Sequence, residues 1–265
     1  MSRTRDTAVD SVAQCEEPAE PPFEPRLALA SLSGESDATW ARAGSDHAGA
    51  AFLGGVALDD ATRDAARALV ARDRTEFLPP DPVAFVAAEF EALADAPLRP
   101  AVNVRTTTVD PLREVGEVCA AHDAILEVNA HCRQEEMCAV GAGETLLCDT
   151  DRLCEYVAVA AGTGATVSVK VRAEVPGVDL AETTRRVVDA GAAIVHVDAM
   201  DSERVVAEIA DAADCFVVAN NGVRDRATVR EYLAYGADAV SVGRASDRPA
   251  VLARVRSAVD EWFAE

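Results

Sequence analysis

One polar side chain in the segment TVSVKVR has clear chemical potential: Lys170, the only lysine among the chain's 25 basic residues. Strict alternation over residues 166–172 places the valines on one face and Ser168, Lys170 and Arg172 on the other, as in a strand. An inward-facing lysine at a strand end can stabilise a developing anion or form a Schiff base. The alternative is a lysine that extends from the strand end into solvent.

A histidine and a cysteine follow other apolar segments. His196 lies in AIVHVDA, where a lone histidine among valines can be either a hydrogen-bonded core group or a functional one. Cys132 follows Asn129 in NAHC, beside His131 and Arg133. A loop cysteine between a histidine and an arginine can serve as nucleophile or general acid, although such a cysteine can also have no role. The cysteine spacings match no metal-binding pattern, so we expect no metal.

Two glycine-containing segments, ANNGV (219–223) and VGRAS (242–246), could hold a phosphate group. Glycines such as Gly222 and Gly243 leave backbone N–H groups accessible to an anion, and Arg244 can add a bidentate guanidinium contact. The alternative is that these glycines serve only tight turns and that Arg244 is a solvated surface charge.

Eight short apolar segments alternate with segments of helical periodicity. Strands that are apolar on both faces favour a single-domain (β/α)8 TIM barrel over an open sheet. We expect the barrel at residues 26–265, after a disordered, acidic and proline-rich leader at residues 1–25. The expected strands are 27–31, 50–54, 101–105, 124–129, 166–172, 193–198, 215–220 and 239–244, and the expected helices include 59–72, 81–94, 179–191, 202–212 and 225–236.

Such a barrel would bring the polar residues together, because the active sites of this fold lie at the C-terminal ends of the strands. Arg105 and Asn129 would end the third and fourth strands, and Arg172 the fifth. The two glycine-containing segments follow the seventh and eighth strands, where barrels commonly bind phosphate. We therefore expect one polar mouth with a phosphate site on one side.

The composition excludes several classes of protein. Acidic residues outnumber basic ones by 46 to 25, and a net charge of -21 is a poor basis for binding nucleic acid backbones. The near-exclusive use of arginine and the abundance of acids indicate adaptation to high salt, where acidic surfaces repel themselves only weakly. Neither a membrane span nor a signal peptide is present in the sequence, so we expect a cytoplasmic protein with reduced cysteines.

Five motifs occur in an order that resembles the dihydrouridine synthase family of flavin enzymes. The resemblance covers roughly residues 100–250 and is carried by the order of the motifs more than by any one of them. It implies FMN across the barrel mouth, reduction of the C5=C6 bond of a tRNA uridine, and NADPH or NADH as electron donor. The motifs are NAHC (129–132) followed by GAGETLL (141–147), KVR (170–172), His196, NNG (220–222) and GR (243–244).

The resemblance also implies a role for each of these residues. Cys132 would protonate C5 of the uracil ring, while Asn129 and Arg172 would hold the base. Lys170 would stabilise negative charge on the reduced flavin, with His196 alongside. The remaining cofactor contacts would come from Asn221, Gly222, Gly243 and Arg244 at the FMN phosphate and from Arg105, which stands where the family usually has glutamine.

The sequence departs from the family pattern at four points. Arg133 replaces a proline after the cysteine, and Asp198 replaces the arginine of an HxR motif. The first strand lacks the usual proline-methionine start. Because the chain ends at Glu265, we also expect the family's helical tRNA-binding domain to be absent.

Other functions remain open on these residues. One is a flavin-dependent dehydrogenase or reductase of a free pyrimidine, similar to dihydroorotate and dihydropyrimidine dehydrogenases. Another is a phosphate-binding barrel without flavin, either a lyase that forms a Schiff base on Lys170 or a non-catalytic binding protein.

Overall fold

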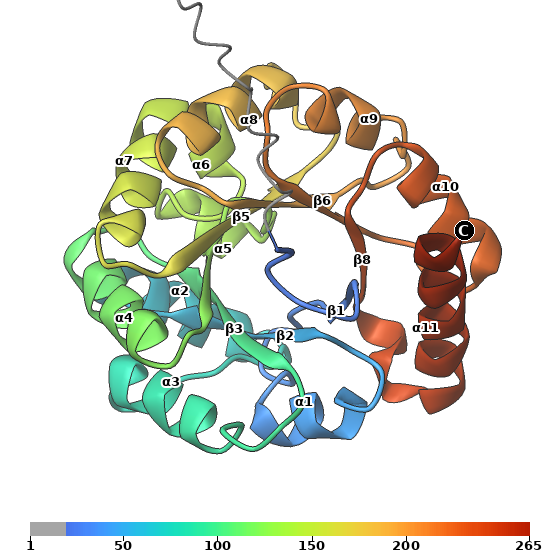
Figure 1. Cartoon of the computed structure of the whole chain (residues 1–265). Coiled ribbons are helices and arrows are strands. Elements are labelled where there is room, and N and C mark those ends of the chain that lie inside the picture. The colour runs from blue at the N-terminus through green and yellow to red at the C-terminus, as the bar shows by residue number, and fades with distance from the viewer. Residues whose placement is uncertain (1–19) are drawn as a thin grey trace, which may run out of the picture.

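Eight parallel strands close into a barrel in the computed structural model, which describes residues 20–265 (Figure 1). Each strand pairs with the next, and β8 pairs with β1. The predicted (β/α)8 fold is confirmed, and all eight predicted strands are present with small shifts at their ends. They are β1 (Leu27–Leu29), β2 (Ala50–Ala57), β3 (Arg99–Arg105), β4 (Ile125–Asn129), β5 (Thr166–Arg172), β6 (Ile194–Asp198), β7 (Phe216–Asn220) and β8 (Ala239–Val242).

Helices surround the barrel between successive strands, and the five predicted helices are all present, the shortest of them α9. The wide interval between β2 and β3 contains two helices, as its length predicts. The helices are α1 (Ala38–Gly44), α2 (Asp60–Val70), α3 (Pro82–Glu91), α4 (Asp110–Ala121), α5 (Glu135–Ala139), α6 (Thr145–Cys148), α7 (Thr150–Ala161), α8 (Leu180–Asp189), α9 (Val205–Ala210), α10 (Arg226–Ala234), the 3-10 turn η1 (Arg244–Asp247) and α11 (Pro249–Ala264).

Aspartates begin six of these helices, α1, α2, α3, α7, α8 and α10. The side chains of Asp59, Asp81, Asp179 and Asp225, for example, each accept backbone N–H groups in the first turn of α2, α3, α8 and α10. At α10 the side chain of Thr228 also accepts the N–H of Asp225, which completes a capping box. Because these contacts satisfy N–H groups that have no partner inside the helix, they fix where each helix starts after its strand.

Alternation along the strands divides the apolar side chains between two cores. The valines of β5, such as Val169, face outward and pack in the large cluster between the barrel and its helices. Phe52, Ile125 and Ile194 face inward and fill the lower part of the barrel. His196 lies two residues beyond Ile194 on the same inward face, so the barrel interior turns from apolar to polar toward the C-terminal ends of the strands.

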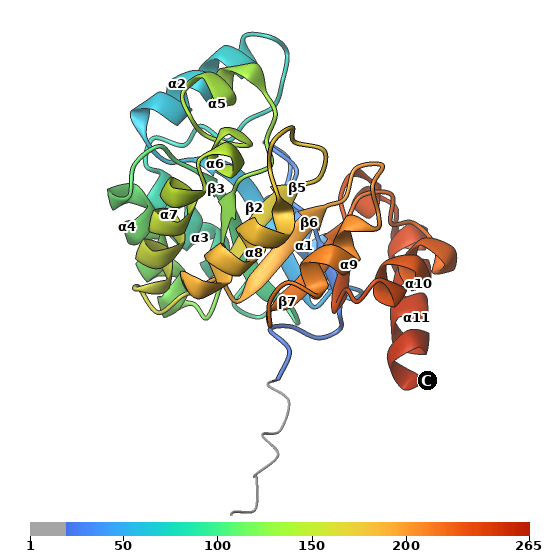
Figure 2. The same ribbon diagram turned by 90° about the horizontal axis from the view of Figure 1, so that it is seen from above.

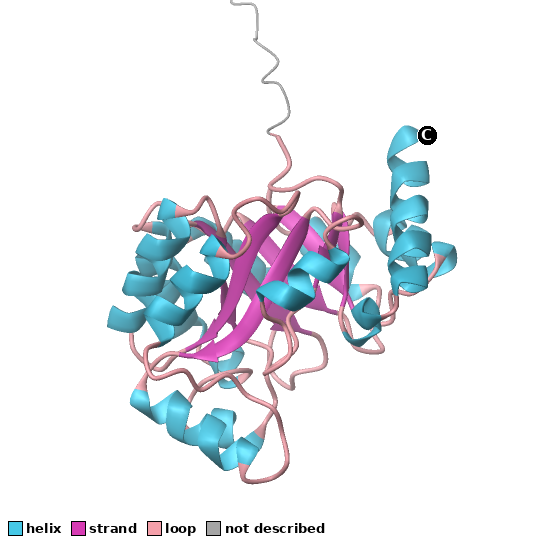
Figure 3. Cartoon of the chain, turned by 90° about the horizontal axis from the view of Figure 1, so that it is seen from below, coloured by secondary structure: helices cyan, strands magenta, loops and turns pink. Residues whose placement is uncertain are grey.

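Two helices extend past the C-terminal ends of the strands on one side of the mouth. Figure 2 shows α2 and α5 side by side there, and Figure 3 shows this pair set apart from the helices around the strands. Leu69 of α2 and Met137 of α5 share an apolar cluster, and Arg72 forms an ion pair with Glu136. The pair forms a wall, here named the α2–α5 wall, beside the polar mouth.

The described chain begins at the opposite end of the barrel (Figure 2). Phe23 is buried there and packs edge-on against Phe216, with 5.2 Å between the ring centroids. The disordered leader is predicted at residues 1–25, and its residues 1–19 lie outside the described residues. Within residues 20–265, no helix is long and apolar enough to cross a membrane.

Candidate active site at the barrel mouth

A buried carboxylate lies inside the barrel, below the mouth. Glu127 of β4 is fully buried and accepts hydrogen bonds from Asn103 Nδ2 at 2.8 Å and Ser168 Oγ at 3.1 Å. His196 Nδ1 lies 2.7 Å from Glu127 Oε2, the oxygen that Ser168 also contacts, and His196 Nε2 lies 2.8 Å from Ser241 Oγ. These side chains, from β3, β4, β5, β6 and β8, form one hydrogen-bonded floor beneath the site.

The charges of this floor follow from burial and mutual contact. Burial disfavours the charged form of the Glu127 carboxylate. His196, Lys170 and Asn103 outweigh this effect and hold the pKa of Glu127 below its ordinary value. Burial and the charge of Lys170 lower the pKa of His196, against the opposing effect of Glu127. Glu127 is therefore charged and His196 neutral, so His196 donates from Nδ1 to Glu127 and accepts from Ser241 at Nε2.

Lys170 stands on this floor and faces a cavity. Its side chain is 2% exposed, and no hydrogen bond or ion pair of its ammonium group is present among residues 20–265. Burial lowers the pKa of Lys170, while the charges of Glu127 and Asp198 oppose that shift. Lys170 is thus an inward-facing amine with no partner among residues 20–265, rather than a lysine extended into solvent.

Cys132 lies in a loop whose backbone is fixed from two sides. Asn129 Oδ1 accepts the N–H of Cys132 at 3.1 Å, and Asn129 Nδ2 donates to Asn103 at 2.7 Å. The carbonyl of Cys132 accepts the N–H of Glu144 at 2.9 Å. Gly143 permits this approach, because a Cβ there would lie 2.2 Å from the Cys132 carbonyl oxygen and its φ is +63°. The motifs NAHC and GAGETLL thus form one structural unit.

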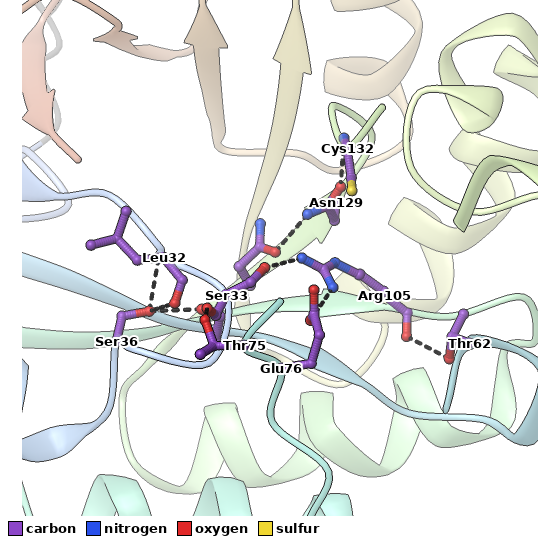
Figure 4. Close-up of polar contacts among 11 residues, drawn as sticks. Leu32, Ser33, Ser36, Thr62, Thr75, Glu76, Arg105, Asn129 and Cys132 are labelled. Carbon is purple, nitrogen blue, oxygen red and sulfur yellow. Dashed lines mark hydrogen bonds and ion pairs between the residues drawn. The ribbon is translucent and has the colours of Figure 1, made fainter. Parts of the chain in front are cut away.

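Two arginines line the cavity next to Cys132. Arg105 is buried and forms an ion pair with Glu76 at 2.6 Å, and it also donates to Ser33 Oγ (Figure 4). Burial works against its charge, but nearby Cys132 and Glu76 raise the pKa of Arg105 above its ordinary value. Arg172 forms an ion pair with Glu144 in the loop that contacts Cys132.

The loops after β7 and β8 form a cradle of backbone donors, here named the amide cradle, on the other side of the mouth. Asn221 and Gly222 both have positive φ, +95° and +66°, which turns the chain sharply at the end of β7. Among residues 20–265, the N–H groups of Gly222, Val223 and Gly243 have no acceptor. Unpaired amides of this kind, with Arg244 beside them, could hold an anion.

Two adjoining cavities lie at the mouth of the barrel. One, of about 280 Å³, contains Cys132 and Arg105, and the other, of about 400 Å³, contains Lys170 and the amide cradle. His131 lines both, and no partner for its Nδ1 is present within residues 20–265. Burial, then the charges of Lys170 and Arg105, hold the pKa of His131 well below its ordinary value, so this imidazole is neutral.

The structure brings most of the predicted residues to these cavities, but not His196. Both nitrogens of His196 are engaged in the floor, and its side chain lines neither cavity. Asn129 reaches the Cys132 cavity, yet both ends of its amide hold other residues in place. Cys132, Arg105 and Arg172 line one cavity, Lys170, Gly222 and Gly243 the other, and Asn221 and Arg244 both.

Sequence reasoning missed three residues of the site. The segment AILEVN (124–129) predicts only a strand, although alternation places Glu127 on the same face as Asn129. His131 enters the prediction only as a neighbour of Cys132. Glu76 lies in the long interval after α2, and no local signal connects it to Arg105.

Comparison with known proteins places this barrel in a family. The model of the dihydrouridine synthase family matches residues 100–264, more than half of the chain. An uncharacterized protein of Methanocaldococcus jannaschii is 27% identical over 234 residues, which cover 84% of this chain and 89% of that protein.

Solved structures share the fold at low sequence identity. A mutant (S)-mandelate dehydrogenase has a TM-score of 0.59 and 12% identity over 91% of this chain and 76% of its own. The tryptophan synthase complex of Pyrococcus furiosus has a TM-score of 0.55 and 15% identity, over 90% of this chain and 97% of its own. A mutant FabK of Thermotoga maritima has a TM-score of 0.53 and 14% identity over 83% of this chain. The chain spans 61% of the length of that FabK chain. These structures show the barrel alone, whereas the match over residues 100–264 shows that the chain belongs to the dihydrouridine synthase family.

Proposed function

We propose that this protein is an FMN-dependent oxidoreductase that reduces the C5=C6 bond of uridine, as a tRNA-dihydrouridine synthase does. The observation that carries the proposal is the pair of adjoining cavities at the mouth. One holds a cation and unpaired backbone amides, and the other holds a cysteine next to a buried arginine. Family membership supplies the reaction class to which these groups are suited.

The Lys170 cavity suits FMN in the chemistry of its donors. The N–H groups of Gly222 and Gly243 and the guanidinium of Arg244 match the acceptors of a phosphate. Lys170 supplies a free ammonium group for the negative charge that a reduced flavin ring carries. The lining is positively charged although the whole chain carries -21, since Asp198 is the only acidic residue of this cavity in the described chain.

The floor residues act on this site through Lys170. Glu127 faces Lys170 from below and favours its charged form, because it is a buried carboxylate within electrostatic range. His196 orients that carboxylate through Nδ1. We therefore assign Glu127 and His196 as positioning residues, and Lys170 as the residue that contacts the cofactor.

Reduction of uracil requires a hydride at C6 and a proton at C5. FMN, when bound and reduced by NADPH or NADH, would supply the hydride. Cys132 donates its Sγ proton to C5 and is left as a thiolate, which Arg105 stabilises from the same cavity before solvent returns the proton. The bond thus gains two hydrogens, and the cysteine is regenerated. Arg172, held by Glu144, contacts the base.

The test is turnover of purified full-length protein with FMN and NADPH or NADH, with unmodified tRNA transcript and free uridine as separate substrates. We expect dihydrouridine by mass spectrometry, lost in Cys132→Ala and kept in Cys148→Ala, which changes an exposed thiol of α6. Absence of flavin uptake, together with trapping of a carbonyl compound on Lys170 by borohydride, would instead establish a Schiff-base lyase.

A further inference from the structure

Arginines gather around Cys132 at the mouth. Arg105 and Arg172 have acidic partners, Glu76 and Glu144. Arg244 belongs to the amide cradle as well as to this cavity. The basic residues that line the Cys132 cavity are Arg74, Arg105, Arg133, Arg172 and Arg244, against the acids Glu76 and Asp198.

Three of these arginines, Arg74, Arg133 and Arg244, have no acidic partner among residues 20–265, and Arg244 already belongs to the amide cradle. No ion pair of Arg74 or Arg133 is present among residues 20–265, although acids outnumber bases by 46 to 25 in the chain. The nearby carboxylate of Glu136 forms its ion pair with Arg72. Arg74 only adds to the charge that lowers the pKa of Glu136. The guanidinium groups of Arg74 and Arg133 are exposed at the rim, where their donors are available to a ligand.

The segments that carry them are fixed to the barrel and to each other. Thr75 Oγ donates to the carbonyl of Ser33 at 3.0 Å, and Gly34 lies so close that a Cβ would be 2.5 Å from Glu76 N (Figure 4). Arg133 directly follows Cys132, whose N–H is held by Asn129. The α2–α5 wall joins the two segments, so Arg74 and Arg133 line one side of one cavity.

We propose that Arg74 and Arg133 form a subsite for the phosphate attached to the uridine that is reduced. The subsite rests on the function proposed above, because it places this phosphate in the cavity of Cys132. Guanidinium groups match phosphate oxygens in geometry and charge. The neutral His131 between the cavities adds no positive charge of its own.

Binding of three probes to the FMN-loaded full-length protein tests the subsite by calorimetry: uridine, 5′-UMP and unmodified tRNA transcript. We expect 5′-UMP to bind about tenfold more tightly than uridine, the ratio expected from about 1.4 kcal/mol of charge-assisted contact. Arg74→Gln and Arg133→Gln should each remove most of this preference and leave uridine binding unchanged. Arg113→Gln removes an equal charge from the exposed face of α4 and should change neither.

The same measurements distinguish the phosphate of a free nucleotide from a phosphodiester of RNA. Loss of tRNA binding in both variants, without preference for 5′-UMP over uridine, would assign the subsite to a phosphodiester of RNA. Equal binding of all three probes, unaffected by either variant, would overturn the subsite while dihydrouridine formation upholds the proposed function. If the unaltered protein reduces none of the probes, the proposed function fails. The binding of 5′-UMP to the two variants then still shows whether Arg74 and Arg133 bind its phosphate.

Discussion

The two sides of the barrel mouth are built in different ways. The amide cradle after β7 and β8 presents mainly main-chain N–H groups, held by two consecutive residues with positive φ. The Cys132 cavity presents side chains, each oriented by a partner from another segment, as Arg105 is by Glu76. On the proposed function, the first side would bind the cofactor phosphate, whereas the second would determine which reaction follows.

This difference predicts that removal of the cysteine separates chemistry from cofactor binding. In Cys132→Ala, uridine reduction should fall by about 10²- to 10⁴-fold, the usual contribution of a general acid. FMN affinity and its reduction by NADPH or NADH should stay unchanged, because Cys132 lines only the other cavity. Stopped-flow absorbance measures the two half-reactions separately. Equal loss of both half-reactions would show that the two sides are not independent.

The floor under both sides should be the most sensitive point for stability. Glu127→Ala leaves Lys170 without its buried carboxylate and His196 without its acceptor, and we expect a loss of about 3–5 kcal/mol in the free energy of unfolding. Glu127→Gln should cost less, because a glutamine oxygen can still accept from Asn103. Urea denaturation measures both variants. A loss below about 1 kcal/mol in Glu127→Ala would contradict the network.

A methyl group in the amide cradle should weaken cofactor binding beyond the strain that it adds to the backbone. Gly222→Ala introduces a Cβ at φ +66° and should cost about 1–2 kcal/mol of backbone strain. Gly177→Ala is a matched control, since Gly177 has φ +80° and open space around it, outside both cavities. Fluorescence titration with FMN should show weaker binding in the first variant only. The same shift in both would trace the effect to strain in the fold.

Acid should destabilise the site by a smaller and gradual amount. His131 and His196 have lowered pKa values, so below about pH 6.5, the ordinary histidine value, the unfolded chain binds more protons than the folded one. Stability should fall by up to about 1.4 kcal/mol per pH unit for each neutral histidine. The depressed pKa of Glu127 extends this loss to lower pH. Urea denaturation across pH 7 to 5 should show a shallower slope in His131→Asn.

The sequence predicts the barrel well because its signals are local. Each strand is a short apolar segment, and aspartates such as Asp59 and Asp225 mark the helices that follow. The amide cradle is predicted for the same reason, since its glycines lie directly after strands. The Cys132 side depends on contacts between distant segments, and neither Glu76 beside Arg105 nor the buried role of Glu127 can be read from nearby residues.

The most direct test of the account is an equilibrium titration of the protein, stripped of any bound flavin, with FMN and with riboflavin, which lacks the phosphate. We predict that FMN binds, that riboflavin binds at least tenfold more weakly, and that Arg244→Gln removes most of this difference. A flavin absorbance band in the purified protein would agree with this. Equal binding of the two flavins, or binding of neither, would contradict the cradle as the site of the cofactor phosphate.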